Sequence, residues 1–225
     1  MNLCHACVAA SRRRRCSAQP TYDAGKADSD GCCGQDDHTA NAGVCTLKNY
    51  LAAHPEANRL NLMHQTAECL EHLHRVHRVV HGDVKIDKVF VCPHGTVLLP
   101  KSERTVPITS EPRAPVDHTE RLPMTTATDV YAFAWLVFHV FTDIDPQELA
   151  ADPKLMRLIA SGVKPNRPGP TTLPAMRGLK DDNIWNTLVH CWEIFPNLRP
   201  TMLDVVKAFD VDLAALQRDF QALGV

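Results

Sequence analysis

The chain has 225 residues, of which 44% are hydrophobic and 22% charged, and its formal net charge is −2 at pH 7. Such values are typical of a soluble globular protein with one sizeable hydrophobic core, and they imply neither a nucleic-acid nor a membrane partner. The longest apolar stretch, about residues 130–141, is shorter than the roughly 20 residues of a membrane-spanning helix. We therefore expect no membrane span.

Residues 1–44 are predicted to be disordered, because they are rich in Cys, Ser, Asp, Gly and Arg and show no period of 2 or 3.6 residues. No apolar core of the signal-peptide type precedes the basic run Arg12–Arg15. We therefore expect a cytoplasmic protein. A nuclear signal at Arg12–Arg15 and a mitochondrial presequence in the acid-free segment 1–22 are weaker alternatives.

Cysteines are concentrated in the same segment, where Cys4 and Cys7 form a CxxC pair. Together with other residues, this pair could bind Zn²⁺ in a tetrahedral site. Further ligands would come from His5, Cys16, Cys32, Cys33 and Cys45. No second CxxC or HxxxH follows at the spacing of a zinc site, so free thiols in a reducing compartment are the preferred interpretation.

From Thr46 onward the apolar residues become periodic, and a first long helix is predicted before residue 81. Its apolar residues step by three and four along one helix face: Leu60, Met63, Ala67, Leu70 and Leu73. Several histidines occur in or just after it, and we expect them mostly on exposed helix faces or in the loop that follows, without the geometry of a metal site. They are His64, His72, His74, His77 and His81.

The next predicted elements are a hairpin and a buried helix. Phe90 and Val91 are followed by a Pro-His-Gly turn at 93–95 and by the apolar run 97–99, which predicts two short antiparallel strands. A second helix is apolar nearly all round, as expected at the centre of a domain; it contains Val130, Phe133, Leu136, Val137 and Val140. The proline-rich stretches 107–115 and 165–174 are predicted loops. The fold class is therefore mainly α with a small β-hairpin.

The segment between the first helix and the hairpin, HGDVKIDKV at 81–89, resembles the catalytic loop HRDxKxxN of protein kinases, with His81, Asp83 and Lys85 in register. Residues 128–134, TDVYAFA, are similar to the SDVYSFG segment that opens the central kinase helix. Residues 191–201 resemble the CWxxxPxxRPT signature of the tyrosine-kinase and tyrosine-kinase-like groups. Lys85 favours the Ser/Thr-specific side of these groups.

The resemblance implies a protein-kinase-like C-terminal lobe at 45–215, followed by 216–225 as the tail of the last helix. Residues 45–51, CTLKNYL, resemble the stretch just past the hinge between the two kinase lobes. An N-terminal lobe needs a Gly-rich loop, a strand carrying the VAIK lysine and a helix whose Glu pairs with that lysine. Residues 1–44 contain none of these patterns, so we expect at most one wall of an ATP pocket.

Both metal-binding positions of the kinase pattern are altered. Lys88 stands where the loop has its Asn, and Lys101, Ser102 and Glu103 stand where the DFG motif is expected. Val116 occupies the position of the Glu in the APE motif. Arg199, the usual partner of that Glu, therefore lacks its ion pair, and Asp117 is the nearest substitute.

The resemblance also assigns roles to the retained residues. Asp83 and Lys85 would be a vestigial base and phosphate contact, while His81, Asp129 and Arg199 would be structural. Asp129 is expected to bind the backbone of the 81–83 loop. As an alternative hypothesis, Lys88 and Lys101 replace the two metal ions with ammonium groups.

These features predict a catalytically inactive, pseudokinase-like lobe that acts as a binding or scaffold module. We expect no cofactor and a protein partner at the surface that faces the N-terminal lobe in kinases, where apolar side chains would be exposed. The alternative is an active Ser/Thr protein kinase that uses ATP and Mg²⁺ and has Asp83 as its base.

Overall fold

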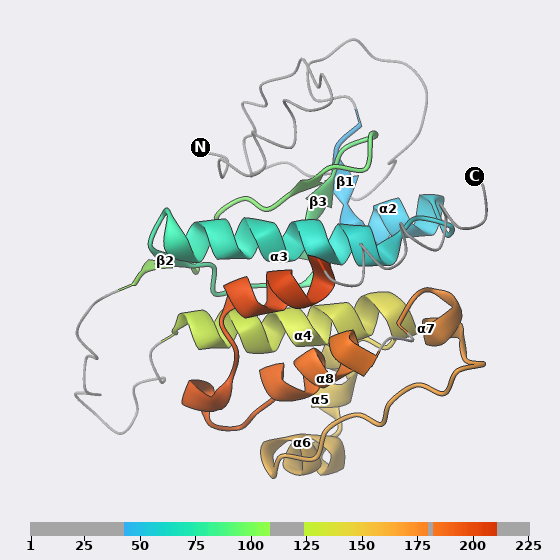
Figure 1. The fold of residues 1–225 in the computed structure, drawn as a ribbon, viewed down its shortest axis with the longest axis vertical. Helices are drawn as coiled ribbons and strands as arrows, with labels where there is room; N and C mark the ends of the chain where they lie inside the picture. The colour runs from blue at the N-terminus through green and yellow to red at the C-terminus, as the bar shows by residue number, and fades with distance from the viewer. Residues whose placement is uncertain (1–42, 109–123, 180–181, 211–225) are drawn as a thin grey trace.

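The computed structural model describes residues 43–108, 124–179 and 182–210 as a mainly helical fold with small antiparallel sheets (Figure 1). The helices are α2 (Leu47–Ala53), α3 (Arg59–Arg75), α4 (Thr126–Thr142), α5 (Pro146–Ala151), α6 (Pro153–Ala160), α7 (Leu173–Met176) and α8 (Asp182–Cys191). The strands are β1 (Cys45–Thr46), β2 (Val79–Val80), β3 (Phe90–Val91), β4 (Val97–Leu98) and β5 (Val106–Pro107). Short 3₁₀ turns occur at η1 (Ile86–Lys88) and η2 (Pro196–Leu198), and residues 202–210 are helical.

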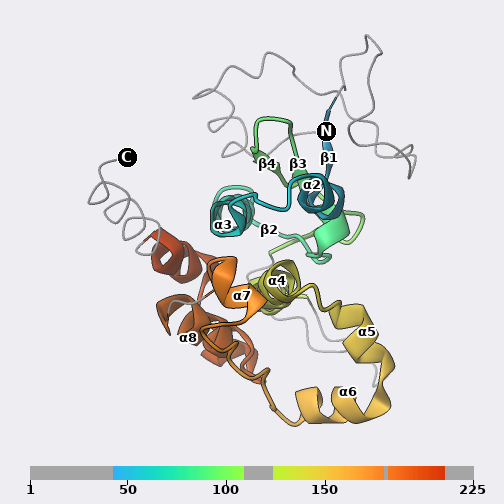
Figure 2. The ribbon, with the colours of Figure 1, turned by 90° about the vertical axis from the view of Figure 1, so that its right-hand side faces the viewer.

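The predicted hairpin is confirmed. Strands β3 and β4 pair antiparallel, with Phe90 opposite Leu98, and β1 adds a third strand on the other side of β3. Gly95 lies in the turn with a φ of 76°, a left-handed conformation that glycine adopts without strain. In Figure 2 this sheet lies beyond α2 and α3, on the side away from α4.

Helices α3 and α4 run side by side through the centre of the molecule in both ribbon views (Figures 1 and 2). The apolar residues predicted for each helix are buried, which confirms both periodicities. Arg59, at the start of α3, is buried as well, and its Nε donates to the carbonyl oxygen of Val140 at 3.0 Å. This bond satisfies a polar group that the packing of the two helices removes from water.

The start of α4 is held by its own side chains. The hydroxyl of Thr128 accepts a hydrogen bond from the amide of Thr125 at 3.1 Å, which pairs one of the donors at the helix entrance. Asp129 follows in the first turn of the helix, where the helix dipole favours a negative charge. The entrance of α4 therefore places a carboxylate against the segment that follows β2.

The two proline-rich stretches are only partly loops. Residues 165–172 form neither helix nor strand, but Pro174 lies in the first turn of α7, a position that tolerates its missing amide hydrogen. Pro107 belongs to β5 and pairs with Val79 at the outer end of a two-stranded sheet. Proline therefore marks element ends here, and the remainder of the first stretch, 109–115, lies outside the described residues.

Four cysteines fall within the described residues, and Cys45, Cys69, Cys92 and Cys191 are all buried as thiols. Burial raises the pKa of Cys191 to about 12, so this thiol stays protonated. The proposed ligands Cys4, Cys7, Cys16, Cys32 and Cys33 lie outside the described residues, as do the predicted disordered segment up to residue 42 and the tail 216–225. Across the described ranges, no helix has both the length and the hydropathy needed to span a bilayer.

Candidate functional site

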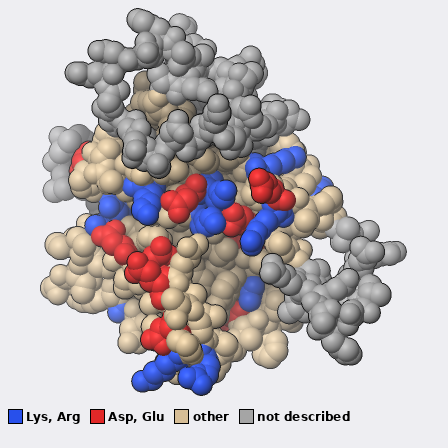
Figure 3. All heavy atoms as spheres, turned by 180° about the vertical axis from the view of Figure 1, so that it is seen from behind, with Lys and Arg blue, Asp and Glu red and all other residues tan. Residues whose placement is uncertain are grey.

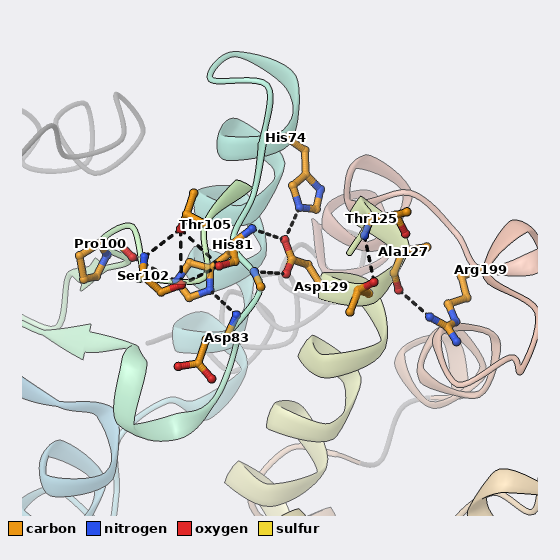
Figure 4. Close-up of polar contacts among 12 residues, drawn as sticks. His74, His81, Asp83, Pro100, Ser102, Thr105, Thr125, Ala127, Asp129 and Arg199 are labelled. Carbon is orange, nitrogen blue, oxygen red and sulfur yellow. Dashed lines mark hydrogen bonds and ion pairs between the residues drawn. The ribbon is translucent and has the colours of Figure 1, made fainter. Parts of the chain in front are cut away.

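The loop between β2 and β3 carries the kinase-like residues, and Asp129 anchors it from the first turn of α4 (Figure 4). One carboxylate oxygen of Asp129 accepts from the amide of His81 at 2.7 Å, and the other accepts from the amide of Gly82 at 2.8 Å. The Asp129 side chain is only 1% exposed, so these are charge-assisted bonds in a site shielded from water. The expected contact between Asp129 and the loop backbone is confirmed.

His74 adds a third bond to the same carboxylate, and this residue corrects the expectation of exposed histidines. Its Nε2 lies 2.8 Å from Oδ2 of Asp129, and the residue is buried at the end of α3. Because an ionised carboxylate only accepts hydrogen bonds, Nε2 of His74 carries the proton in this contact. Within α3, His64 and His72 are half-buried; beyond its end, His77 is half-buried and His81 is fully buried.

The ring of His81 is held between two backbone groups. Its Nε2 donates to the carbonyl oxygen of Pro100 at 3.1 Å, and its Nδ1 accepts from the amide of Asp83 at 3.2 Å. Burial lowers the pKa of His81 below its ordinary value of 6.5, although the charges of Asp129 and Asp83 and the Pro100 bond oppose the shift. The ring is therefore neutral at pH 7, and it links the loop to the segment after β4.

Asp83 and Lys85 lie together nearer the surface. The Lys85 ammonium is 3.4 Å from a carboxylate oxygen of Asp83, and their side chains are 38% and 18% exposed. In Figure 4 the Asp83 carboxylate points away from the buried Asp129 network. A carboxylate in this position could accept a proton from a bound hydroxyl group. Its ion pair with Lys85 also gives the side chain a structural role that needs no catalysis.

Lys88 and Lys101, the residues at the altered metal positions, are both exposed. Neither forms an ion pair with another described residue. The described part of the chain also contains no group of three or more His, Cys, Asp or Glu side chains that could hold a metal ion.

Residues 101–105 form a turn that the resemblance did not predict. The hydroxyl of Thr105 accepts from the amide of Ser102 at 2.9 Å, and the hydroxyl of Ser102 accepts from the amide of Arg104 at 3.1 Å. Both hydroxyls also donate to the carbonyl oxygen of His81, at 2.7 Å from Ser102 and 3.3 Å from Thr105. The signal was present in the sequence as Ser and Thr three residues apart, a spacing at which side chains bond to nearby backbone in turns.

Gly82, which stands at the Arg position of the HRD pattern, was also missed. Its φ is 75°, and a Cβ atom on this residue would lie 2.7 Å from the carbonyl oxygen of Arg104 and 2.8 Å from Sδ of Met124. Both the backbone conformation and the space therefore require glycine. The 101–105 turn takes up the room that a larger residue at position 82 would need.

Arg199 binds backbone groups at the other end of the site. Its guanidinium donates to the carbonyl oxygens of Ala127 at 2.8 Å, Glu193 at 2.7 Å and Ile194 at 3.2 Å. It also lies 4.6 Å from the ring centre of Tyr131, a cation–π distance. These contacts tie the entrance of α4 to the segment before η2, while Val116 and Asp117, its expected surroundings, lie outside the described residues.

Most of the large exposed apolar side chains lie outside the segment 45–108 that carries the 81–83 loop. Between Cys45 and Ile108, only Val76 and Val106 are both large and exposed among the described residues. The others belong to later segments: Ile144, Met156, Leu158, Val163, Leu173, Met176, Ile194, Phe195, Leu198 and Leu203. Figure 3 shows the face opposite that of Figure 1, where Lys and Arg side chains alternate with Asp and Glu across the middle.

A scan against protein-family models finds no match for the chain, and a search of curated proteins finds none either. The kinase resemblance therefore depends on the three sequence segments and on the contacts that join them. Those contacts are the Asp129 anchor of the 81–83 loop and the Arg199 contacts at the start of α4.

Proposed function

We propose that this chain is a kinase-like C-terminal lobe that has no phosphoryl-transfer activity and acts as a protein-binding or scaffold module. The observation that carries the proposal is the contrast between the anchored 81–83 loop and the two positions where kinases have metal ligands. Asp129 holds the backbone of His81 and Gly82 as the resemblance implies, yet exposed lysines occupy the positions of both metal ligands. The loop architecture is present without the groups that bind Mg²⁺.

Catalysis by this chain would lack the larger of two contributions to the rate, charge neutralisation, and keep only the smaller one, a general base. Phosphoryl transfer depends chiefly on positioning and on neutralising the charge of the transferred group, which Mg²⁺ supplies in kinases. A general base such as Asp83 contributes only about 10² to 10⁴ in rate. Ammonium groups at positions 88 and 101 repel a divalent cation, so the larger contribution is missing even though Asp83 is retained.

A protein partner fits a module whose polar loop is preformed. The loop residues Asp83, Lys85, Asp87 and Lys88 present both signs of charge on a backbone held by buried bonds. Mixed charges of this kind favour a specific orientation of a partner more than raw affinity. The partner surface is therefore proposed around this loop, on the side that faces the N-terminal lobe in kinases.

An active Ser/Thr kinase is the second candidate, and one observation favours it. Asp83 and Lys85 form a pair at 3.4 Å, which would place a proton acceptor beside a phosphate-binding cation. In that case ATP would be the substrate, and Lys88 and Lys101 would take over charge neutralisation from the metal ions.

Nucleotide titration and a phosphoryl-transfer assay separate the two candidates. For the scaffold function we expect no saturable Mg·ATP binding below about 1 mM, an upper range for enzyme substrates, and no transfer to protein hydroxyls. The matched pair of variants is Asp83→Asn and Asp87→Asn, since Asp87 is an exposed acid of the same loop. Transfer by the wild type that Asp83→Asn abolishes and Asp87→Asn retains would establish the kinase instead.

A further inference from the structure

Two segments that a kinase would join through metal ions are joined here by hydroxyl groups. In the kinase pattern, the Mg²⁺ ions are held by the Asp of DFG and by the Asn of the catalytic loop. In this chain, Ser102 and Thr105 both donate to the carbonyl oxygen of His81 (Figure 4). The ring of His81 donates in turn to Pro100, immediately before the turn.

We propose that Ser102 and Thr105 form a hydroxyl latch that holds the 81–83 loop in one conformation without metal or nucleotide. This inference rests on the proposed function and deepens it, since it makes the binding loop permanently formed. A partner would then meet the same surface whether or not nucleotide is present.

The bonding of the loop backbone supports a single conformation. The amides of His81 and Gly82 donate to Asp129 on one side, and the carbonyl of His81 accepts from the two hydroxyls on the other. A carbonyl oxygen has two lone pairs, and this one has two donors within hydrogen-bonding distance. Opening the loop would leave these partly buried groups unpaired, which is costly in free energy.

The latched turn is compatible with glycine at position 82 but not with the arginine that the HRD pattern has there. A Cβ at position 82 would collide with the backbone of Arg104, which belongs to the latched turn. An arginine at this position, as in the HRD pattern, therefore requires the turn to move away. Val106, which directly follows the turn, pairs with Val80, so the end of the turn is fixed to β2 while β2 and β5 stay paired.

The test is site-resolved amide hydrogen exchange on the full chain, comparing wild type with the double variant Ser102→Ala/Thr105→Val. Exchange within the turn will rise trivially, because the variant removes acceptors of the Ser102 and Arg104 amides. The informative amides are those of His81, Gly82 and Asp83, whose own acceptors are untouched. We expect their exchange to accelerate about tenfold or more relative to amides of α3, as loss of local hydrogen bonds implies.

The matched control is Ser161→Ala/Thr187→Val, which removes two hydroxyls that also donate to backbone carbonyls but lie outside the site. It should leave the 81–83 amides at the wild-type rate. Gly82→Arg should accelerate exchange at 102–105, because the side chain displaces the turn. If the double variant does not fold, Ser102→Ala alone removes the shorter bond and gives the same readout.

Three results would overturn the latch: wild-type amides at 81–83 that exchange without protection, acceleration confined to 102–105 in the double variant, or equal acceleration in the control. In addition, Mg·ATP at about 1 mM should not change the wild-type pattern. A failure of the proposed function is a separate result, since phosphoryl transfer by the wild type would refute the scaffold role and leave the effect of the hydroxyl variants intact.

Discussion

The buried anchor and the exposed lysines of the candidate site differ in what holds them in place. Asp129 is almost completely buried and accepts bonds from His74, His81 and Gly82. Lys88 and Lys101 are exposed and form no ion pair with other described residues. Asp129 is needed for a stable fold, because its loss leaves several buried groups unpaired. Exposed side chains such as Lys88 and Lys101 contribute little to stability, so only a role in binding or catalysis would require a particular residue there.

This difference means that an anchored 81–83 loop is no evidence of phosphoryl-transfer chemistry. The anchor can persist in any protein that needs this loop for stability. Lys88 and Lys101, in contrast, are exposed, so we expect other polar side chains to replace them at little cost in stability. Substitutions at the two kinds of position should therefore differ clearly in their effect on the free energy of unfolding.

Asp129→Ala should have the largest effect. The substitution removes the acceptor of two backbone amides and the partner of His74, and each buried donor left unpaired costs about 1–3 kcal/mol. The free energy of unfolding, measured by urea denaturation, should fall by at least that amount, together with any partner binding. Asp83→Asn, in the same loop, should leave both within error. If the two variants lost equal amounts of unfolding free energy, Asp129 would not differ from Asp83 in its contribution to stability.

His74→Phe should have the next largest effect, because it leaves one oxygen of Asp129 with a single donor. We expect a loss of about 1–3 kcal/mol in unfolding free energy. A double-mutant cycle with Asp129→Asn measures the coupling between the two residues, which should exceed about 0.5 kcal/mol for a direct contact. Additive losses would show that the 2.8 Å contact contributes nothing to stability.

The sequence predicted the parts of this arrangement that follow a period or a motif. The helix periodicities identified α3 and α4, and the kinase resemblance identified Asp129 as the loop anchor. His74 was missed because histidine is intermediate between buried and exposed residue types, so its type alone does not predict burial. It follows Leu70 by four positions, however, and so shares the buried face of α3. Spacing alone could have placed it in the core.

The latch and Gly82 were missed for a different reason. Comparison with the DFG pattern draws attention to what Ser102 lacks, while its hydrogen bonds depend on the tertiary approach of the turn to His81. No local pattern specifies that approach. Similarly, the need for glycine at position 82 is apparent only from the tertiary structure, because the backbone of Arg104 lies where a Cβ atom would be.

Acidification should destabilise the site through His81. Its pKa is lowered in the folded state by burial, so between that value and the ordinary value of 6.5 the unfolded chain binds more protons. The stability from this group is fully present above pH 6.5 and is lost as the pH falls through 6.5 toward the folded-state pKa. The slope should not exceed about 1.4 kcal/mol per pH unit for one proton.

Urea denaturation across this pH range measures the slope directly. His81→Gln should make it shallower, while His94→Gln, which changes an exposed histidine of the hairpin turn, should retain it. A stability that rises on acidification, or a slope unchanged in His81→Gln, would contradict the assignment of this effect to the buried ring.

Restoring the kinase residues at the exposed positions should have the smallest effect of all. In Lys88→Asn/Lys101→Asp both side chains face solvent, and substitutions at such positions usually change the free energy of unfolding by less than about 0.5 kcal/mol. Thermal or urea denaturation should therefore match the wild type, although both metal-ligand types are now present. A loss above about 1 kcal/mol would show that the lysines stabilise the loop through contacts with the rest of the chain. Lys88 and Lys101 would then have a structural role like that of Asp129, and their replacement of metal ligands would no longer support the proposed non-catalytic function.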